Sequence, residues 1–342
     1  MPDTVLVTGI SGFLGGHVAL ALNKQGYRVR GSLRNLGKAE KVRETLSRHG
    51  ADPERLEFVA LDLNSDAGWQ EAAAGCRYVQ HIASPFVIAM PDDPEELIRP
   101  AVEGTGRALA AALGGGAERI VLTSSTAAMF YGHSRSRTAV FTEADWTIEG
   151  QPDVNAYSTS KVRAERHAWQ IMEQAGRRDD LAVINPSGIF GPLLDEDPGT
   201  SGAILARLLN GGVPAAPRLA FPVVDVRDVA ALHVIAMVSP EAGGRRIPIS
   251  DEPLPLIEMA RALAREFPQY ARRLPRFEVP DWAVRVFALF DAEARGNLGE
   301  LGRTKRIDAS RAVALLGRDL VPATDAAIAT ARSLVEHGLV RD

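Results

Sequence analysis

The first 190 residues alternate short apolar runs with longer amphipathic stretches, and this alternation constrains the fold more than any other feature. The apolar runs are candidate strands: Thr4–Thr8, Arg28–Leu33, Leu56–Leu61, Tyr78–Ile82, Arg119–Thr123 and Leu181–Asn185. The stretches between them include four candidate helices: Phe13–Lys24, Glu40–Arg48, Glu95–Leu113 and Ala156–Gln174. This alternation predicts an α/β fold, a doubly wound parallel sheet with helices on both faces. Ligands of such sheets bind outside the carboxyl ends of the strands.

Composition excludes several classes of protein. The chain has 342 residues, a net charge of −4 and one cysteine, Cys76. A disulfide framework or a cysteine-rich zinc site is therefore impossible, and the seven histidines show no ligand spacing, so we expect no metal. The acidic balance argues against non-specific binding to nucleic acid or to an anionic membrane. No signal peptide or long apolar segment is visible, which predicts a cytoplasmic location.

A glycine-rich turn follows the first candidate strand directly. Gly9, Gly12 and Gly15 are spaced as GxxGxxG. Backbone amides approach a pyrophosphate closely only where no Cβ intrudes, and the following helix presents its positive N-terminus. The spacing alone arises by chance about 0.25 times per chain of this composition. Its place between the first strand and the first helix predicts a Rossmann-type dinucleotide site, with a plain tight turn as the alternative.

The end of the second candidate strand indicates which dinucleotide is bound. An acidic residue there would bind the 2′-hydroxyl of NAD, but this chain has Arg34, whose guanidinium can clamp a phosphate. Lys38 and Lys41 add positive charge, unless they form a solvated basic helix face. The pattern favours NADP(H). Asp62 and Leu63 end the third strand, where they would bind the adenine amine and pack on its ring.

Tyr157 and Lys161 form the tyrosine–lysine pair expected of an acid–base site. Only five of the 39 basic residues are lysines, and no other tyrosine has a lysine four residues later. Residues at this spacing share one helix face, and an ammonium stabilises a phenolate and lowers its pKa. The fifth candidate strand ends in Ser124 and Ser125, and we favour Ser125 as the hydroxyl that binds a substrate carbonyl. Hydrolase, zinc-protease and P-loop motifs are absent from the sequence.

The pattern changes after residue 185. A Pro- and Gly-rich loop covers 186–198, Thr200–Leu209 resembles a helix, and Phe221–Val229 resembles a strand and turn where we expect the sheet to resume. From Glu252 onward the pattern is mostly helical. We therefore expect an NADP-binding Rossmann domain (residues 1–188 and 220–250). The remaining residues, 189–219 and 251–342, would form a smaller, mostly helical C-terminal substrate lobe.

With these residues in view, the whole chain resembles the extended short-chain dehydrogenase/reductase family. It is most similar to the branch of plant dihydroflavonol 4-reductases, cinnamoyl-CoA reductases and fungal methylglyoxal/isovaleraldehyde reductases. The motifs that carry the resemblance are Thr8–Gly15, Gly31–Lys41, His81–Phe86, Val121–Ser125, Asn155–Lys161, Asn185–Pro192 and Val224–Val229.

The resemblance implies a role for each matching position. Tyr157 would donate the proton, and Lys161 would hold the nicotinamide ribose and lower the pKa of Tyr157. Arg227 and Asp228 would belong to a structural turn. The remaining cofactor contacts would be Gly9, Gly12, Phe13, Leu14 and Gly15 at the pyrophosphate, Arg34 and Lys41 at the 2′-phosphate, Asp62 and Leu63 at adenine, Ala83 and Ser84 at the ribose, and Pro186 and Ser187 at the nicotinamide.

One position departs from the flavonoid reductases. They carry an asparagine that contacts polyphenol hydroxyls five residues after the catalytic serine, and here that residue is Phe130. A phenyl ring cannot make those hydrogen bonds, so a dihydroflavonol specialist is not expected. Phe86, Met129, Phe130 and Tyr131 instead indicate a pocket for apolar aldehydes or ketones, or else an aromatic core cluster.

These observations predict NADPH-dependent reduction of an aldehyde or ketone through a Ser125–Tyr157–Lys161 mechanism. A nucleotide-sugar epimerase or dehydratase of the same fold and a non-catalytic NADP sensor remain alternatives. The expected partner is a small-molecule carbonyl compound, without nucleic acid or membrane, and the chain would act as a monomer or homodimer.

Overall fold

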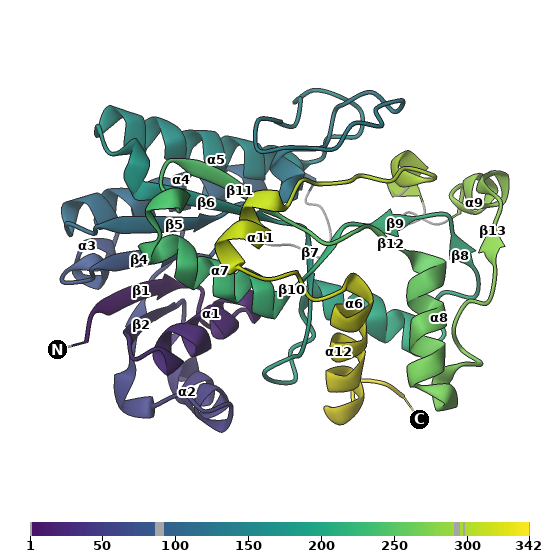
Figure 1. Cartoon of the computed structure of the whole chain (residues 1–342), viewed down its shortest axis with the longest axis horizontal. Helices are drawn as coiled ribbons and strands as arrows, with labels where there is room; N and C mark the ends of the chain where they lie inside the picture. Colours follow the sequence, from purple (N-terminus) through teal and green to yellow (C-terminus); the bar gives the residue numbers. More distant parts are fainter. Residues whose placement is uncertain (1, 86–91, 291–294, 297, 342) are drawn as a thin grey trace.

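The computed structural model describes residues 2–85, 92–290, 295–296 and 298–341. Its centre is a parallel sheet of seven strands in the order β11-β6-β5-β4-β1-β2-β3 (Figure 1). The strands are β1 (Thr4–Thr8), β2 (Arg28–Leu33), β3 (Leu56–Ala60), β4 (Tyr78–His81), β5 (Arg119–Thr123), β6 (Leu181–Pro186) and β11 (Arg245–Ile249). The predicted doubly wound α/β fold is therefore confirmed.

Helices cover both faces of this sheet because each side of its strands is apolar. One face packs against α1 (Phe13–Lys24), α2 (Ala39–Arg48) and α7 (Val226–Val238). The other face packs against α3 (Trp69–Ala73), α4 (Glu95–Gly114) and α5 (Ala156–Gln174). Burial on both faces explains why the strands read as continuous apolar runs.

A second apolar core lies beyond the carboxyl ends of the strands. It is built from α6 (Gly199–Leu209), α8 (Leu256–Glu266) and α12 (Ala323–Glu336). Three short strand pairs accompany these helices: β7 (Gly188–Phe190) with β10 (Val223–Asp225), β9 (Ala220–Phe221) with β12 (Leu254–Pro255), and β8 (Ala216–Pro217) with β13 (Glu278–Val279). The pair β7/β10 lies next to the large sheet, and the pair β8/β13 lies farthest from it (Figure 1). Figure 1 shows this part beside the sheet, together with α9 (Asp281–Phe287).

Two sequence expectations differ from the structure. The large sheet resumes at β11 rather than at Phe221–Val229, because β10 pairs with β7 and α7 begins directly after it. Helix α11 (Ser310–Leu316), assigned by sequence to the C-terminal lobe, places Ala312 in the core of the sheet instead. The strand Arg245–Ile249 was not predicted because it begins with two arginines, and its pairing with β6 is a tertiary contact. Among the described helices, none combines the length and apolarity needed to cross a bilayer.

Candidate active site

The glycine-rich turn between β1 and α1 is packed too closely for side chains. Gly9 has a φ of +71°, and a Cβ there would lie 3.1 Å from the Cα of Ala83. A Cβ on Gly15 would lie 2.1 Å from the carbonyl oxygen of Gly9. Helix α1 has Gly12 as its N-cap, with no capping side chain and no acidic residue in its first turn. The positive helix end therefore faces the turn without a competing carboxylate, which fits a pyrophosphate.

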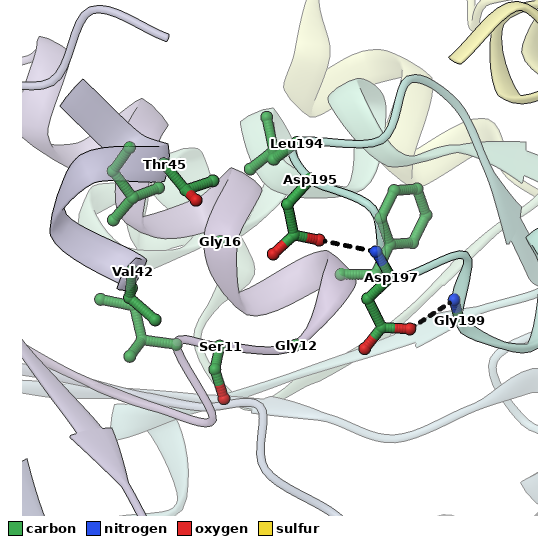
Figure 2. A pocket seen from close by; sticks show the side chains of 12 residues that line it. Ser11, Gly12, Gly16, Val42, Thr45, Leu194, Asp195, Asp197 and Gly199 are labelled. Atoms are coloured by element: carbon green, nitrogen blue, oxygen red, sulfur yellow. Dashed lines mark hydrogen bonds between the residues drawn. The ribbon is translucent and has the colours of Figure 1, made fainter. Parts of the chain in front are cut away.

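A small pocket of about 60 Å³ lies beside this turn (Figure 2). Phe13 and Leu14 are the first two residues of α1. Leu14 is buried, and Phe13 packs against both the core of the large sheet and the core of the C-terminal helices. The rest of the wall comes from the turn, α2 and the loop after β7, including Ser11, Val42, Thr45, Leu194, Asp195 and Asp197. The pocket joins the glycine-rich turn to a loop that lies far away in sequence.

The basic residues after β2 differ in their surroundings. Arg34 is exposed directly after the strand, and Lys38 is exposed a few residues later. Lys41 forms a 2.9 Å ion pair with Glu196, whose carboxylate raises the pKa of Lys41. The side chain of Arg34 is thus accessible to a ligand, whereas the charge of Lys41 is shared with the carboxylate of Glu196.

Asp62 and Leu63 follow β3 at the same edge of the sheet, since β2 and β3 pair in parallel. Asp62 is exposed and accepts a 2.8 Å hydrogen bond from the amide of Asn64. Leu63 packs against Gly104 of α4, where a Cβ would lie 2.7 Å from its side chain. The aspartate can reach a ligand, while the leucine already supports the helix.

The loop after β4 is held by the side chain of Thr8. The Thr8 hydroxyl lies 2.9 Å from Nδ1 of His81 and accepts hydrogen bonds of 3.0 Å from the amides of Ile82 and Ala83. Burial, assisted by the charge of Lys161, lowers the pKa of His81 to about 3, so this histidine is neutral. These contacts hold Ala83 against the glycine-rich turn. Phe86 lies outside the described residues.

The three predicted catalytic side chains meet at the carboxyl ends of β4 and β5. Helix α5 is started by a capping box between Asn155 and Ser158, which places Tyr157 and Lys161 on its first two turns. Tyr157 forms a side-chain hydrogen bond with Ser125. The ammonium of Lys161 lies 5.6 Å from the ring centre of Tyr157. Residues far apart in the chain thus form one cluster.

The charges in this cluster differ from the sequence expectation. Burial raises the pKa of Tyr157, and the hydrogen bond with Ser125 offsets part of that rise. Burial lowers the pKa of Lys161 to about 8, with the charge of Glu165 acting in the opposite direction. Lys161 donates a 3.0 Å hydrogen bond to Oγ of Ser84. The hydrogen bond with Ser125 thus lowers the pKa of Tyr157, and the hydrogen bond with Ser84 directs Lys161 toward the predicted ribose site.

Pro186 and Ser187 lie at the end of β6, directly beside the cluster. The amide of Ser187 donates a 3.1 Å hydrogen bond to the carbonyl of Ile249. Its hydroxyl is buried and has no hydrogen-bond partner among the described residues. An orphaned buried hydroxyl calls for a partner, and a ligand supplies one. Together with the turn that excludes Cβ atoms at Gly9 and Gly15, this hydroxyl fits a dinucleotide lying across the strand ends.

A mostly apolar cavity of about 180 Å³ lies next to this site. Phe130 lines it, and the ring centre of Tyr131 lies 4.6 Å from that of Phe130. Met129 is fully buried, with no surface available to a substrate. The other lining residues come from the strand ends, α6 and β9, namely Thr126, Gly188, Phe190, Ser201, Ile204, Phe221 and Pro222.

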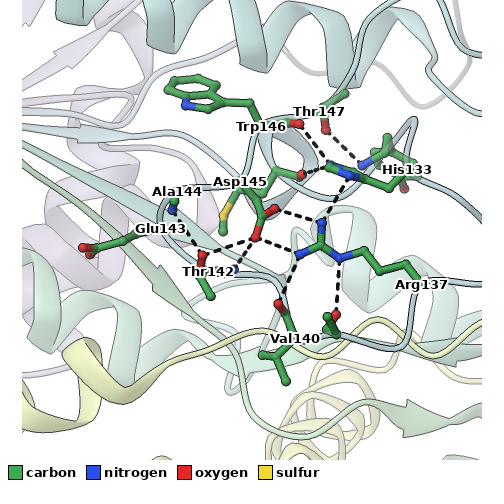
Figure 3. Close-up of polar contacts among 12 residues, drawn as sticks. His133, Arg137, Val140, Thr142, Glu143, Ala144, Asp145, Trp146 and Thr147 are labelled. Atoms are coloured by element: carbon green, nitrogen blue, oxygen red, sulfur yellow. Dashed lines mark hydrogen bonds and ion pairs between the residues drawn. The ribbon is translucent and has the colours of Figure 1, made fainter.

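The segment after Phe130 is fixed by polar contacts (Figure 3). Arg137 forms an ion pair with Asp145, with its two nitrogens 2.9 and 3.0 Å from the two carboxylate oxygens. Nε2 of His133 lies 3.1 Å from the carbonyl oxygen of Met129 and 3.0 Å from that of Trp146. The segment that follows Phe130 in the wall of the apolar cavity is therefore tied to residues 145–146 by polar contacts.

Sequence reasoning missed two buried charged residues beside the site. Lys305 lies 4.4 and 4.0 Å from the ring centres of Phe130 and Tyr131 and 2.7 Å from Glu300. Lys305 is more than 170 residues from Phe130 and Tyr131 in the sequence, so no local motif connects them. Glu165 is fully buried on α5, one helical turn after Lys161. The sequence could have indicated it, because Tyr157, Lys161 and Glu165 follow one another at intervals of four residues and so share one helix face.

Known proteins resemble this chain in sequence and in fold. The family model described as "NAD dependent epimerase/dehydratase family" matches residues 5–249. Cinnamoyl-CoA reductase 1 of rice is 38% identical over 269 residues, covering 78% of this chain and 76% of the relative. The structure of yeast methylglyoxal/isovaleraldehyde reductase, complexed with NADPH, is 26% identical, with a TM-score of 0.78 over 98% of this chain and 100% of that one.

Vestitone reductase from alfalfa has the same fold, with 23% identity and a TM-score of 0.76 over 98% of this chain and 99% of that one. The range matched by the family model includes the glycine-rich turn and the positions of Ser125, Tyr157 and Lys161. The resemblance predicted from the motifs is thus confirmed. The chain belongs to the NAD dependent epimerase/dehydratase family, as an extended short-chain dehydrogenase/reductase whose curated relatives include cinnamoyl-CoA reductases.

Proposed function

We propose that this protein is an NADPH-dependent reductase that converts an aldehyde or ketone with an apolar substituent to the alcohol. The observation that carries the proposal is the cluster of Ser125, Tyr157 and Lys161 beside a cavity lined by Phe130. NADPH, when bound, would supply the hydride that the carbonyl carbon receives.

The chain's own residues support this cofactor. The turn at Gly9 and Gly15 and the uncapped end of α1 would hold the pyrophosphate. Arg34 would bind the 2′-phosphate through its fork of donors, with Lys41 contributing once its ion pair with Glu196 is exchanged. Lys161 and Ser84 would hold the nicotinamide ribose, and Ser187 would border the ring. The NADPH complex of the yeast relative supports this choice.

The acid–base step would belong to Tyr157 and Ser125. Both hydroxyls would donate hydrogen bonds to the substrate oxygen, which polarises the carbonyl and stabilises charge that develops on it. Because burial raises the pKa of Tyr157, its phenol is protonated at neutral pH and can donate that proton to the oxygen. Lys161 would hold positive charge nearby and stabilise the phenolate that remains.

The cavity favours substrates with an apolar group next to the carbonyl. Phe130, Phe190 and Phe221 are three of its lining residues, and Thr126 and Ser201 supply its side-chain hydroxyls. Such a wall binds an alkyl or aryl substituent through burial and has few groups to satisfy a polyhydroxylated ring.

The test is NADPH oxidation followed at 340 nm with purified protein across aliphatic aldehydes, diketones, aryl ketones and flavanonols. We expect turnover with aldehydes or ketones, a lower KM for longer apolar substituents, and a clear preference over NADH. Conversion of a UDP- or GDP-sugar with retained NAD would instead identify an epimerase or dehydratase. NADPH binding without turnover on any carbonyl would identify a sensor.

A further inference from the structure

We propose that Glu165 is a positioning residue of the reductase site, which fixes the strand ends that carry Ser125 and places its carboxylate one helical turn from Lys161. This inference rests on the proposed function for its role in turnover. Its physical core, the coupling between Glu165 and Lys161, concerns this chain alone and is testable without a substrate.

The carboxylate of Glu165 joins four elements of the fold. It is fully buried, yet its oxygens accept hydrogen bonds from Ser124 Oγ (2.5 Å), Asn185 Nδ2 (2.7 Å), Arg246 Nε (2.5 Å) and Trp169 Nε1 (3.4 Å). These donors lie after β5, on β6, on β11 and on α5 itself. Both oxygens of this buried carboxylate therefore have partners, and the guanidinium of Arg246 supplies an opposite charge.

The network reaches the proposed catalytic hydroxyl through two of these partners. Asn185, besides binding Glu165, donates a 3.3 Å hydrogen bond to the carbonyl oxygen of Ser125. The amide of Ser124 donates a 2.8 Å hydrogen bond to the carbonyl of Ile184. Glu165 thus restrains Ser124 and Asn185, and through them the position of Ser125.

The network also sets the charge beside Tyr157. Lys161 lies one helical turn before Glu165, and Glu165 is the charge that opposes the effect of burial on the pKa of Lys161. Of the other titratable groups around Lys161, Tyr157 keeps its proton because burial raises its pKa, and His81 on β4 is neutral. Within the described residues, the identified anion near this ammonium is therefore Glu165. The guanidinium of Arg246 forms an ion pair with the Glu165 carboxylate.

An ion pair that merely holds the fold together is the competing explanation. Arg246 has such a role, because it donates to the carbonyl oxygens of Glu143 and Asp145 and lies 3.7 Å from the ring centre of Trp146. A purely structural Glu165 would contribute to the melting temperature and leave the pKa of Lys161 unchanged. The two explanations therefore differ in one measurable quantity.

The experiment titrates the lysines by NMR in protein labelled at lysine ¹³Cε. The chain has only five lysines, and the Lys161→Arg variant identifies the signal of Lys161. We compare the intact protein with Glu165→Gln, which keeps the shape and hydrogen bonding of the side chain but removes its charge. Glu173→Gln, an exposed glutamate of α5 paired with Arg178, is the matched control for net charge.

We expect Glu165→Gln to lower the pKa of Lys161 by about one unit, because residues four apart on a helix are neighbours and the variant removes the charge that opposes the effect of burial. Glu173→Gln should leave it unchanged. If Glu165→Gln does not fold, the double variant Glu165→Gln/Arg246→Met removes the unpaired arginine as well and should show the same direction of shift. An unchanged Lys161 pKa in the folded variant overturns the inference.

Measurements of NADPH turnover test this inference and the proposed function separately. In an active reductase, the alkaline limb of kcat/KM should move to lower pH in Glu165→Gln by the same interval as the Lys161 pKa. Wild-type protein that oxidises no NADPH refutes the proposed function while the NMR result stands. An active enzyme whose pH profile does not move in Glu165→Gln refutes the positioning role.

Discussion

Replacing Lys161 by arginine separates two properties that this site requires of a cation: a positive charge and a small size. Burial lowers the pKa of Lys161 to about 8, so roughly nine-tenths of the side chain is protonated at pH 7 and about a tenth at pH 9. If the ammonium is needed, kcat/KM for NADPH in the wild type should fall about tenfold across this interval. Arginine keeps its charge throughout, because its pKa exceeds 12 by a wide margin.

Lys161→Arg should therefore lose the alkaline limb near pH 8 but be slow at every pH. The side chain of Lys161 is 8% exposed and its Nζ donates to Ser84 at 3.0 Å, so the broader guanidinium has to displace its neighbours. Overpacking of this kind costs about 1–3 kcal/mol. Where that cost falls on the transition state, it corresponds to a loss of about 5- to 160-fold in rate.

The assay measures kcat/KM for NADPH between pH 6 and 10, since this ratio reports groups of the free enzyme. Lys161→Met is the control without charge and should be the slowest of the three at neutral pH. Wild-type activity of Lys161→Arg at pH 7, or an alkaline limb near pH 8 that persists in it, would refute this account of the lysine.

Three further predictions concern the proton donor, the cofactor and the glycine-rich turn. Tyr157→Phe should reduce kcat about 100-fold or more while the Kd for NADPH, measured by fluorescence, changes little; near-normal turnover contradicts the mechanism. Arg34→Gln should weaken NADPH about tenfold or more and leave NADH unaffected, and equal effects on both cofactors would exclude a 2′-phosphate contact. Gly15→Ala, whose Cβ would lie 2.1 Å from the Gly9 carbonyl oxygen, should lower Tm and weaken NADPH binding. Gly12→Ala, with a nearest contact of 3.3 Å, should retain Tm.

Much of the site could be predicted from local sequence signals. The turn at Gly9, the strand end at Ser125 and the helix bearing Tyr157 each lie at an element boundary, and six of the seven sheet strands were recognised from apolar runs. Parallel topology then brings those boundaries together, because all the carboxyl ends lie at one edge. The missed strand, Arg245–Ile249, lies at the edge of the described sheet beside β6 and carries arginines at its start.

Local signals could not indicate contacts between distant segments. The ion pair of Lys41 with Glu196 joins α2 to a loop more than 150 residues later, and it changes how much charge Lys41 can offer a phosphate. The burial of Met129, which removes it from the proposed substrate contacts, likewise depends on packing rather than on residue type.

The amino-acid sequence by itself determined the doubly wound fold, the dinucleotide turn and the tyrosine–lysine pair, because each depends on spacing over a few residues. Only the tertiary structure decided the charges of the site. The pKa of a buried group depends on how much water is excluded and which charges lie nearby, and those neighbours come from several strands. For Lys161, they are the loop at Ser84, the ring of Tyr157 and the carboxylate of Glu165, which Arg246 holds from the far edge of the sheet.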